Sequence, residues 1–349
     1  MLFAQLLSEA AVKLQKCGQF DFPDTEIVAV AYDSANIYIA TGDGSLHSID
    51  AATLRKNWSS AIGGAIVSNL IVAEGRIHVA VNAKPIGDAK AESSVVRTLN
   101  AETGLVIRNS PVPYSDRMYV GITGKSLVVV SQNGSIVSTE RVNGNVIWVT
   151  SVVGKINGMP DFDFDRIVVA TDQKEIISID GTTGKVVMRS KTRFRPISVL
   201  SYNDRTVAIG DERGNLALID SASGKTVWKY KSGGKISNIA ETSEGVLALS
   251  NDNFVYMLWD YNGDVLWKRR LPGRIASAPL IGGDTISVQV SGERSAFILD
   301  VKSGKIINQL QLSDLNSPGI PPRVFDNGRF IFSTLASLNS YSVKPCAVE

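Results

Sequence analysis

Cysteine and histidine are scarce in this chain of 349 residues, which contains two of each. The cysteines, Cys17 and Cys346, lie near opposite ends, and no CxxC motif or Cys/His cluster occurs. Zinc sites need three or four such ligands at close spacing, so no metal site of this type is expected. Free thiols are expected for the two cysteines, and a disulfide between them is the alternative if the chain ends meet.

Long hydrophobic runs and an excess of one charge are also missing. No stretch approaches the roughly eighteen apolar residues that a membrane-spanning helix requires. Lys and Arg number 36 against 34 Asp and Glu, and this balance by itself points neither to nucleic acid nor to a membrane surface. Residues 1–17 contain Glu9, Lys13 and Lys16 and so lack the apolar core of an export signal. We therefore expect a cytoplasmic location or a place in a soluble assembly, with the periplasm as the alternative for a processed chain.

Helical periodicity is absent from residues 25–345. Only residues 1–17 space their apolar side chains as one face of a helix does. This pattern predicts a short N-terminal amphipathic helix, which either packs against the domain or serves as an anchor for a partner.

The chain instead repeats a β-type unit, which is clearest in residues 207–230, VAIGDERGNLALIDSASGKTVWKY. Two short apolar runs flank a polar turn, the second run ends on an acidic residue, and a tight Gly turn leads into a strand with Trp. Runs broken in this way by Gly, Asn and Asp indicate antiparallel strands joined by hairpins. The residue that ends the second run recurs at spacings of 40, and once of 50, at Asp50, Asn100, Glu140, Asp180, Asp220, Asp260 and Asp300.

A period near 40 with several strands per repeat is typical of a β-propeller. Inner strands are predicted to begin near Ile27, Ile66, Met118, Ile156, Ile197, Ile236, Ile275 and Val324, which gives eight blades. The last repeat ends before its outer strand, so residues 19–22 are predicted to pair there and close the ring. The predicted fold class is all-β, with eight four-stranded antiparallel blades over residues 25–349 and a helix plus ring-closing strand in residues 1–24.

Four of the five Trp residues recur at one place in the repeat and are predicted to pack between blades: Trp58, Trp148, Trp228 and Trp267. Each indole N–H is expected to donate to a backbone carbonyl. Trp259 falls outside this register and is expected to pack within its own blade. The repeated Asp is expected to accept turn N–H groups, and the repeated Gly to supply positive φ.

The order of Asp, small-residue turn, Gly-Lys and Trp, as in IDSASGKTVW and IDGTTGKVVM, resembles the repeat of quinoprotein (PQQ-type) dehydrogenase propellers. It is also similar to the eight-bladed, non-enzymatic BamB-like scaffold of the bacterial outer-membrane assembly machinery. The dehydrogenases rely on adjacent cysteines and an acidic calcium site, and this sequence contains neither. The resemblance therefore implies the scaffold without a catalytic apparatus or cofactor. It also implies a periplasmic lipoprotein that binds an assembly partner.

Enzymatic interpretations find little support in the residues. His47 and His78 fall on different repeats without a Ser or Cys nucleophile in a recognisable setting, so each is expected on a strand surface. Asp161, Asp163 and Asp165 alternate along an extended segment, but no Gly-containing calcium loop follows them. A polar loop is expected there, and no catalytic, cofactor-binding or metal-binding residue is predicted.

A basic residue precedes most of the predicted inner strands. These residues are Arg117, Lys155, Arg195, Lys235, Arg274 and Arg323. Because the inner strands of a propeller line its channel, equivalent positions are predicted to form a basic ring that attracts an anionic ligand or an acidic segment. The alternative is that Lys and Arg simply keep these strand-entry loops solvated.

The predicted function is a non-catalytic scaffold for protein–protein interaction in a multi-subunit assembly. The basic ring is the first candidate surface, and the insertion Ala83–Ser94, which lengthens the second repeat, is the next. Two alternatives remain open. One is a propeller that binds nucleic acid or another polyanion, with steep salt dependence, and the other is a quinoprotein-like propeller enzyme that binds a small molecule or sugar.

Overall fold

The computed structural model describes residues 15–83, 93–112, 116–163, 165–203, 205–275, 277–292, 295–311, 322–325, 329–342 and 345–346. No helix occurs in these ranges, so the predicted N-terminal helix is not supported. Its last residues, 15 to 17, lie in strand β1 (Gln15–Asp21), and the rest of it falls outside the described residues. The whole described part of the chain is built from strands and turns.

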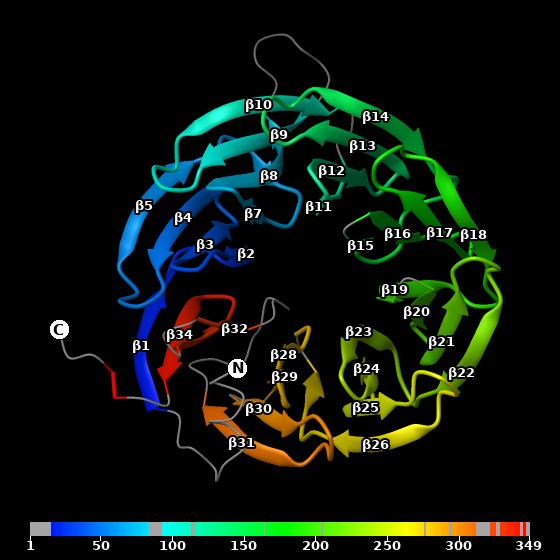
Figure 1. The fold of residues 1–349 in the computed structure, drawn as a ribbon. Coiled ribbons are helices and arrows are strands. Elements are labelled where there is room, and N and C mark those ends of the chain that lie inside the picture. Colours follow the sequence, from blue (N-terminus) through cyan, green and yellow to red (C-terminus); the bar gives the residue numbers. More distant parts are fainter. Residues whose placement is uncertain are drawn as a thin grey trace. The chain divides into compact units, whose positions relative to one another are not determined.

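The chain forms two compact units, one from Met1–Ser115 with Pro272–Glu349 and the other from Asp116–Leu271. Each unit contains four antiparallel sheets, in which the strands follow one another from the inner to the outer edge (Figure 1). The sheets are the blades of a β-propeller, and the predicted all-β class and the predicted count of eight are both confirmed.

Blades 3 to 6 make up the unit of residues 116–271. Blade 3 contains β11 (Met118–Thr123), β12 (Ser126–Ser131), β13 (Ser135–Glu140) and β14 (Val146–Ser151). Blade 4 contains β15 (Asp161–Phe162), β16 (Arg166–Ala170), β17 (Glu175–Asp180) and β18 (Val186–Lys191). Blade 5 contains β19 (Pro196–Asn203), β20 (Thr206–Asp211), β21 (Asn215–Asp220) and β22 (Thr226–Lys231). Blade 6 contains β23 (Ile236–Thr242), β24 (Gly245–Ser250), β25 (Phe254–Leu258) and β26 (Val265–Arg270).

Blades 1, 2, 7 and 8 make up the other unit. Blade 1 contains β2 (Ile27–Tyr32), β3 (Asn36–Thr41), β4 (Ser45–Asp50) and β5 (Lys56–Ala61). Blade 2 contains β6 (Ala65–Ile66), β7 (Ile71–Ala73), β8 (Arg76–Ala83), β9 (Ser93–Asn100) and β10 (Val106–Val112). Blade 7 contains β27 (Arg274–Ile275), β28 (Leu280–Gly282), β29 (Thr285–Ser291), β30 (Ser295–Asp300) and β31 (Ile306–Gln311). Blade 8 contains β32 (Arg323–Val324), β33 (Arg329–Ser333), β34 (Ser337–Ser342) and β1.

The predicted starts of the inner strands agree with the structure within about a residue in seven blades. In blade 4, Ile156 forms only an isolated bridge with Thr171, and β15 begins five residues later. Inner strands are also split in blades 2 and 7, where two short segments pair with one neighbour. Pro160 and Pro279 stand at two of these breaks, and a proline cannot donate a hydrogen bond to the ladder.

Blade 8 is completed by the N-terminal segment, as predicted. Strand β1 pairs antiparallel with β34 in the outer position, with Phe20 opposite Leu338. This pairing brings the two ends of the chain together, and Cys17 and Cys346 form a disulfide. The expectation of free thiols was therefore wrong and its alternative holds, because strand pairing places two cysteines side by side that are 329 residues apart in sequence.

The hydrophobic core lies between adjacent blades. Side chains from blades 3 and 4 form one cluster, those from blades 4 and 5 a second, and those from blades 5 and 6 a third. The middle strands are covered on both faces, and this explains why His78 in β8 is fully buried and bonded to Thr98, with 3.1 Å between Nδ1 and Oγ1. The prediction that His78 is a surface residue was wrong.

The predicted role of the repeated Trp is confirmed in three blades. The indole N–H groups of Trp58, Trp148 and Trp228 donate to the carbonyls of Ala101, Gly181 and Asp260, each in the following blade, at 3.0, 3.1 and 2.6 Å. Each ring covers the turn glycine of that blade, so a β-carbon added at Gly104, Gly184 or Gly263 would lie 2.5–2.7 Å from the ring. The motif therefore joins one sheet to the next.

One register assignment in blade 6 needs correction. In blade 5 the amide of Asp220 donates to the carbonyl of Lys225 and closes the turn after the third strand, and in blade 6 the amide of Trp259 donates to the carbonyl of Asp264 in the same way. Trp259, and not Asp260, thus takes the place of the repeated acid. Its side chain is 38% exposed in the turn and its ring lies 5.6 Å from that of Tyr261, rather than being packed within the blade.

Candidate partner-binding site

Three of the predicted basic residues of blades 3 to 6 occupy the same backbone position. The carbonyls of Arg117, Lys155 and Lys235 accept hydrogen bonds of 2.8–2.9 Å from the amides of Gln132, Asp172 and Asn251, which follow the second strands. Arg195 directly precedes the first residue of β19. In blade 1 the equivalent carbonyl belongs to Glu26 and accepts from Gly42, so the basic pattern does not extend to that blade.

We call Arg117, Lys155, Arg195 and Lys235 the basic face, because each directly precedes the first paired residue of the inner edge in four consecutive blades. The first three are exposed and Lys235 is half-buried. None forms an ion pair with another described residue. Their charge is therefore left for a ligand or the solvent to neutralise.

Arg274 and Arg323 belong to the other unit. They are the first residues of β27 and β32, and both are exposed. They therefore occupy the predicted place in blades 7 and 8.

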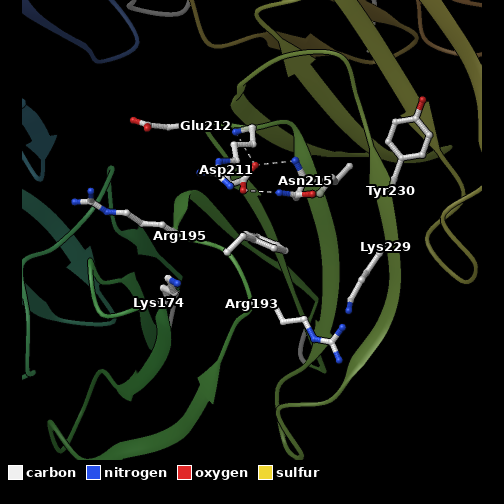
Figure 2. Close-up of a pocket in the computed structure, with 11 residues that line it drawn as sticks. Lys174, Arg193, Arg195, Asp211, Glu212, Asn215, Lys229 and Tyr230 are labelled. Atoms are coloured by element: carbon white, nitrogen blue, oxygen red, sulfur yellow. Dashed lines mark hydrogen bonds between the residues drawn. The ribbon is translucent and has the colours of Figure 1, made fainter.

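A cavity of about 540 Å³ lies on blade 5, with contributions from blade 4 and from the connector between them. Its lining includes five cationic side chains and two carboxylates, and so carries a net charge of +3. The cations are Lys174, Arg193, Arg195, Arg213 and Lys229. Figure 2 shows Arg195, Lys174 and Glu212 toward one side and Arg193 and Lys229 toward the other. We call this the cationic cavity.

In the connector from blade 4 to blade 5, one partly buried residue stands between two exposed arginines of the cavity. Phe194 is partly buried and packs against the cluster of Val207 and Ile209, so its neighbours Arg193 and Arg195 are left exposed. Thr192 fixes the connector to the turn of blade 4, because its amide donates to the carbonyl of Lys174 at 2.8 Å. Lys174 is held there at a φ of 60°. These contacts bring Lys174, Arg193 and Arg195 to the lining of one cavity.

The turn between the second and third strands of blade 5 forms another part of the lining. Asp211 is 2% exposed, and its carboxylate accepts from the amides of Arg213 and Asn215 at 2.9 and 2.7 Å. The side-chain amide of Asn215 donates to the same carboxylate at 2.6 Å. These bonds fix the position of the Asp211 carboxylate in the turn, and its charge is included in the net charge of +3.

Tyr230 adds to the lining from the outer strand β22. Burial, and then the charge of Asp252, raises the pKa of its hydroxyl, which stays neutral at physiological pH. Lys174 and Arg213 were missed by sequence reasoning because they lie in turns of different blades. The sequence DERGN places a basic residue two positions after Asp211, and this is the one signal that could have indicated Arg213.

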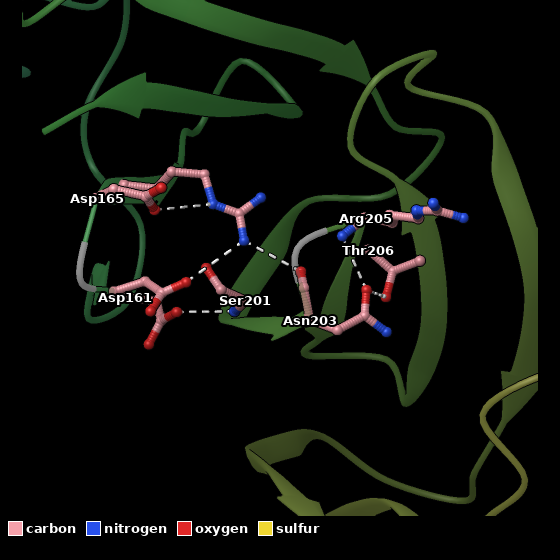
Figure 3. A network of polar contacts seen from close by, with 8 residues as sticks. Asp161, Asp165, Ser201, Asn203, Arg205 and Thr206 are labelled. Atoms are coloured by element: carbon pink, nitrogen blue, oxygen red, sulfur yellow. Dashed lines mark hydrogen bonds and ion pairs between the residues drawn. The ribbon is translucent and has the colours of Figure 1, made fainter.

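The other end of the inner strands is acidic. Arg166 pairs with Asp163 at 3.4 Å and with Asp165 at 3.8 Å, and also donates to the carbonyl of Asn203 at 3.1 Å. Figure 3 shows this network, in which Asp161 accepts from the amide of Ser201 at 2.7 Å and links blades 4 and 5. The polar loop predicted for these residues holds only in part, because Asp161 lies in strand β15, whereas Asp163 and Asp165 lie outside the strands. Among the described residues, no group of three or more His, Cys, Asp or Glu side chains is arranged to hold a metal ion.

Two carboxyls at this acidic end have raised pKa values. Burial raises the pKa of Asp161, and the charge of Asp163 adds a smaller contribution in the same direction. Burial, followed by the charge of Asp163, raises the pKa of Glu241 in blade 6. The inner strands of blades 5 and 6 thus begin just after the cations Arg195 and Lys235, and their far ends lie near the carboxylates of Asp161 and Glu241.

His47 in blade 1 has a serine partner that sequence reasoning did not identify. Ser59 Oγ lies 3.0 Å from Nδ1 and Thr41 Oγ1 lies 3.1 Å from Nε2, and Thr41 in turn donates to Asp43 at 2.7 Å. Burial lowers the pKa of the imidazole, although Asp43 acts in the opposite direction. The carboxylate reaches the ring only through Thr41, so the direct contact that orients a general base in a nucleophile triad is missing from this chain of contacts.

The insertion of the second repeat lies largely outside the described residues. Its two ends extend β8 and β9 to eight residues each. Among the described residues, no helix is long and apolar enough to cross a membrane.

Comparison with known proteins agrees with the fold. The family model described as outer membrane protein assembly factor BamB matches residues 12–107, 92–243 and 212–322. The solved structure of BamB from Moraxella catarrhalis is similar at 16% identity with a TM-score of 0.69, and the match covers 97% of this chain and 100% of that one. Sqt1 from Saccharomyces cerevisiae is similar at 12% identity with a TM-score of 0.77, over 95% of this chain and 99% of that one.

The computationally designed protein Ika8 is similar at 11% identity with a TM-score of 0.79, over 94% of this chain and 99% of that one. At these identities the solved structures indicate a shared fold and nothing further. No curated protein sequence matches the chain significantly.

Proposed function

Because this chain belongs to the family of the outer membrane protein assembly factor BamB, we propose that it is a non-catalytic scaffold that binds protein partners within a larger assembly. The basic face is the proposed contact surface, and an acidic segment of the partner is the proposed ligand. The single observation that carries this proposal is the recurrence of a cation without an ion-pair partner among the described residues, directly before the first paired residue of the inner edge, in four consecutive blades.

The charge distribution supports an acidic ligand. Like charges on neighbouring strands add their potentials, and a partner of opposite sign is both attracted and oriented by the sum. The carboxylates at the far end of the inner strands repel the same ligand. An acidic segment is therefore favoured at one end of these strands only.

The disulfide provides an argument about the cellular compartment of the protein. Disulfides persist in oxidising compartments and are rare in the reducing cytosol. With Cys17 and Cys346 joined, we propose the periplasm, the alternative location from the sequence, in preference to the cytoplasm.

The proposal is tested by affinity capture from an extract of the source organism. Wild type is compared with R117A/K155A/K235A, a variant of the basic face that leaves the cationic cavity intact. The control K185A/K225A/K305A removes equal charge from exposed turn lysines. A protein captured by wild type and by the control, but lost with the basic-face variant, is the expected result.

Two outcomes would overturn the proposal. Equal capture of every partner by wild type and the basic-face variant would remove the basic face as the contact surface. Recovery of nucleic acid that moderate salt releases, with no protein partner, would favour the polyanion alternative.

A further inference from the structure

The cationic cavity has properties that the scaffold role does not require. Its five cations come from the turn of blade 4, the connector, the turn of blade 5 and strand β22, and they surround one concave space. None of the five side chains forms an ion pair or donates a hydrogen bond to another described residue. Like charges around one concave space add their positive potentials there, and the sum attracts an anionic ligand.

The size of the cavity argues for a compact ligand. A space of about 540 Å³ is in the range of small-molecule sites, whereas a folded partner needs a broad surface. Phe194 and Leu216 form an apolar floor, and Leu216 is fully buried. The concave shape lets several of the cations face one bound group.

The types of cation specify the chemical class. Three of the five are arginines, and a guanidinium presents a planar fork of donors that matches the oxygens of a phosphate. Lys174 and Lys229 add point charges. With a net charge of +3, a multiply charged oxyanion fits the lining better than a single carboxylate does.

We propose that the cationic cavity is a binding site for a small phosphate-class anion, a pyrophosphate or a phosphate ester. The site is independent of the proposed scaffold function, because Lys174, Arg193, Arg213 and Lys229 are not part of the basic face. Arg195 is the one residue that the two share.

The test is calorimetric titration of the oxidised, full-length protein with inorganic pyrophosphate at low salt. The cavity variant K174A/R213A removes two cations that lie in turns and have exposed side chains. Wild type is expected to bind one pyrophosphate per chain, and the cavity variant to bind at least about ten-fold more weakly, because two charge-assisted contacts are lost. The control K185A/K225A and the basic-face variant K155A/K235A are each expected to change the affinity by less than about two-fold.

A second titration distinguishes the sources of the phosphate group. A peptide with one phosphoserine is compared with its unphosphorylated form and with pyrophosphate. Tighter binding of the phosphopeptide assigns the site to a modified protein segment, and tighter binding of pyrophosphate assigns it to a free small molecule.

The proposal is overturned if pyrophosphate does not bind to wild type, or if K174A/R213A binds it as well as wild type does. Thermal unfolding of each variant verifies that the fold is retained. Absence of pyrophosphate binding does not change what the capture experiment with R117A/K155A/K235A shows. The two proposals are therefore tested independently.

Discussion

At the scale of single residues, the turn acids act as caps for the outer hairpins. Asp180 Oδ1 accepts from the amide and the hydroxyl of Thr183, both at 2.7 Å. The same pair of bonds joins Asp50 with Thr53, and the hydroxyl bond recurs between Asp300 and Ser303. The cap satisfies turn N–H groups that no strand can pair.

We expect Asp180→Ala to lower the free energy of unfolding by about 1 kcal/mol, because the turn N–H groups lose their acceptor at a site open to solvent. Glu140→Ala is the matched control: Glu140 occupies the same place in blade 3 and is exposed without a cap hydrogen bond. Chemical denaturation of the two variants measures the difference. Equal losses in both would contradict the capping role.

The pH dependence of this cap has a definite sign. The hydroxyl of Thr183, and then its amide, hold the pKa of Asp180 below the ordinary value of 3.8. A lowered folded-state pKa means that the cap stabilises the fold above 3.8 and loses this contribution as the pH falls through the folded value. The stability difference between wild type and Asp180→Ala should therefore be full at neutral pH and narrow in acid, as denaturation at several pH values would measure.

The caps were predictable from sequence because they depend on local spacing, with Asp followed at the third position by Ser or Thr. The substitution of Trp259 for an acid was not predictable. Asp260 lies one residue away and preserves the 40-residue period, so only the backbone hydrogen bond identifies the true equivalent. The burial of His78 was also missed, because a two-residue alternation does not reveal that a neighbouring sheet covers the second face.

At the scale of elements, three blades are each joined to the next by a Trp that packs on a turn glycine. Gly263 has a φ of 76° and faces the ring of Trp228, which is 6% exposed. Glycine is required there for two reasons: the positive φ, and the absence of a side chain between turn and ring.

Gly263→Ala tests the second reason. An added β-carbon would lie 2.7 Å from the ring of Trp228, so we expect a loss of about 2–4 kcal/mol in the free energy of unfolding from strain and overpacking together. Gly75→Ala is the control, since its φ is 68° and nothing lies within 4 Å of the added atom.

The control Gly75→Ala should lower the free energy of unfolding by only about 1 kcal/mol, because it adds only the strain of the positive φ. Chemical denaturation of both variants measures their free energies of unfolding, and the difference between the two losses is the part caused by the clash with the Trp ring. A Gly263→Ala variant no less stable than Gly75→Ala would show that the Trp contact is unimportant.

Strand existence and order were predictable because the apolar runs and glycine turns recur. The breaks in the inner strands of blades 2, 4 and 7 were not, since they depend on local geometry and on prolines that also occur in turns. The cationic cavity was only partly predictable. Arg193, Arg195 and Lys229 lie close in sequence to an inner strand, but Lys174 reaches the cavity through the hydrogen bond of Thr192 to its carbonyl.

At the scale of the whole molecule, the disulfide reinforces the pairing of β1 with β34. It closes a loop of 329 residues, and constraining so long a loop reduces the entropy of the unfolded chain. Pairing of the ends was predictable from the missing outer strand of the last repeat. The disulfide was predicted only as the alternative to free thiols. Cys346 lies after strand β34, and the repeat pattern does not predict the course of the chain there.

Removal of the disulfide should therefore destabilise the protein. We expect Cys17→Ser/Cys346→Ser to lower the free energy of unfolding by about 2–5 kcal/mol, with no change in the sheet content measured by circular dichroism. Reduction of wild type should reproduce the loss and leave the double variant unchanged. Equal stability of oxidised and reduced wild type would show that β1 is held by its strand pairing alone.

The central claim, that the basic face recognises an acidic protein segment, is tested most directly by fluorescence anisotropy with a labelled oligoglutamate peptide. The account predicts that wild type and K185A/K225A/K305A bind the peptide alike, and that R117A/K155A/K235A binds it at least about ten-fold more weakly. Equal binding by all three proteins would contradict the account, because the attraction would then come from net charge and not from the basic face.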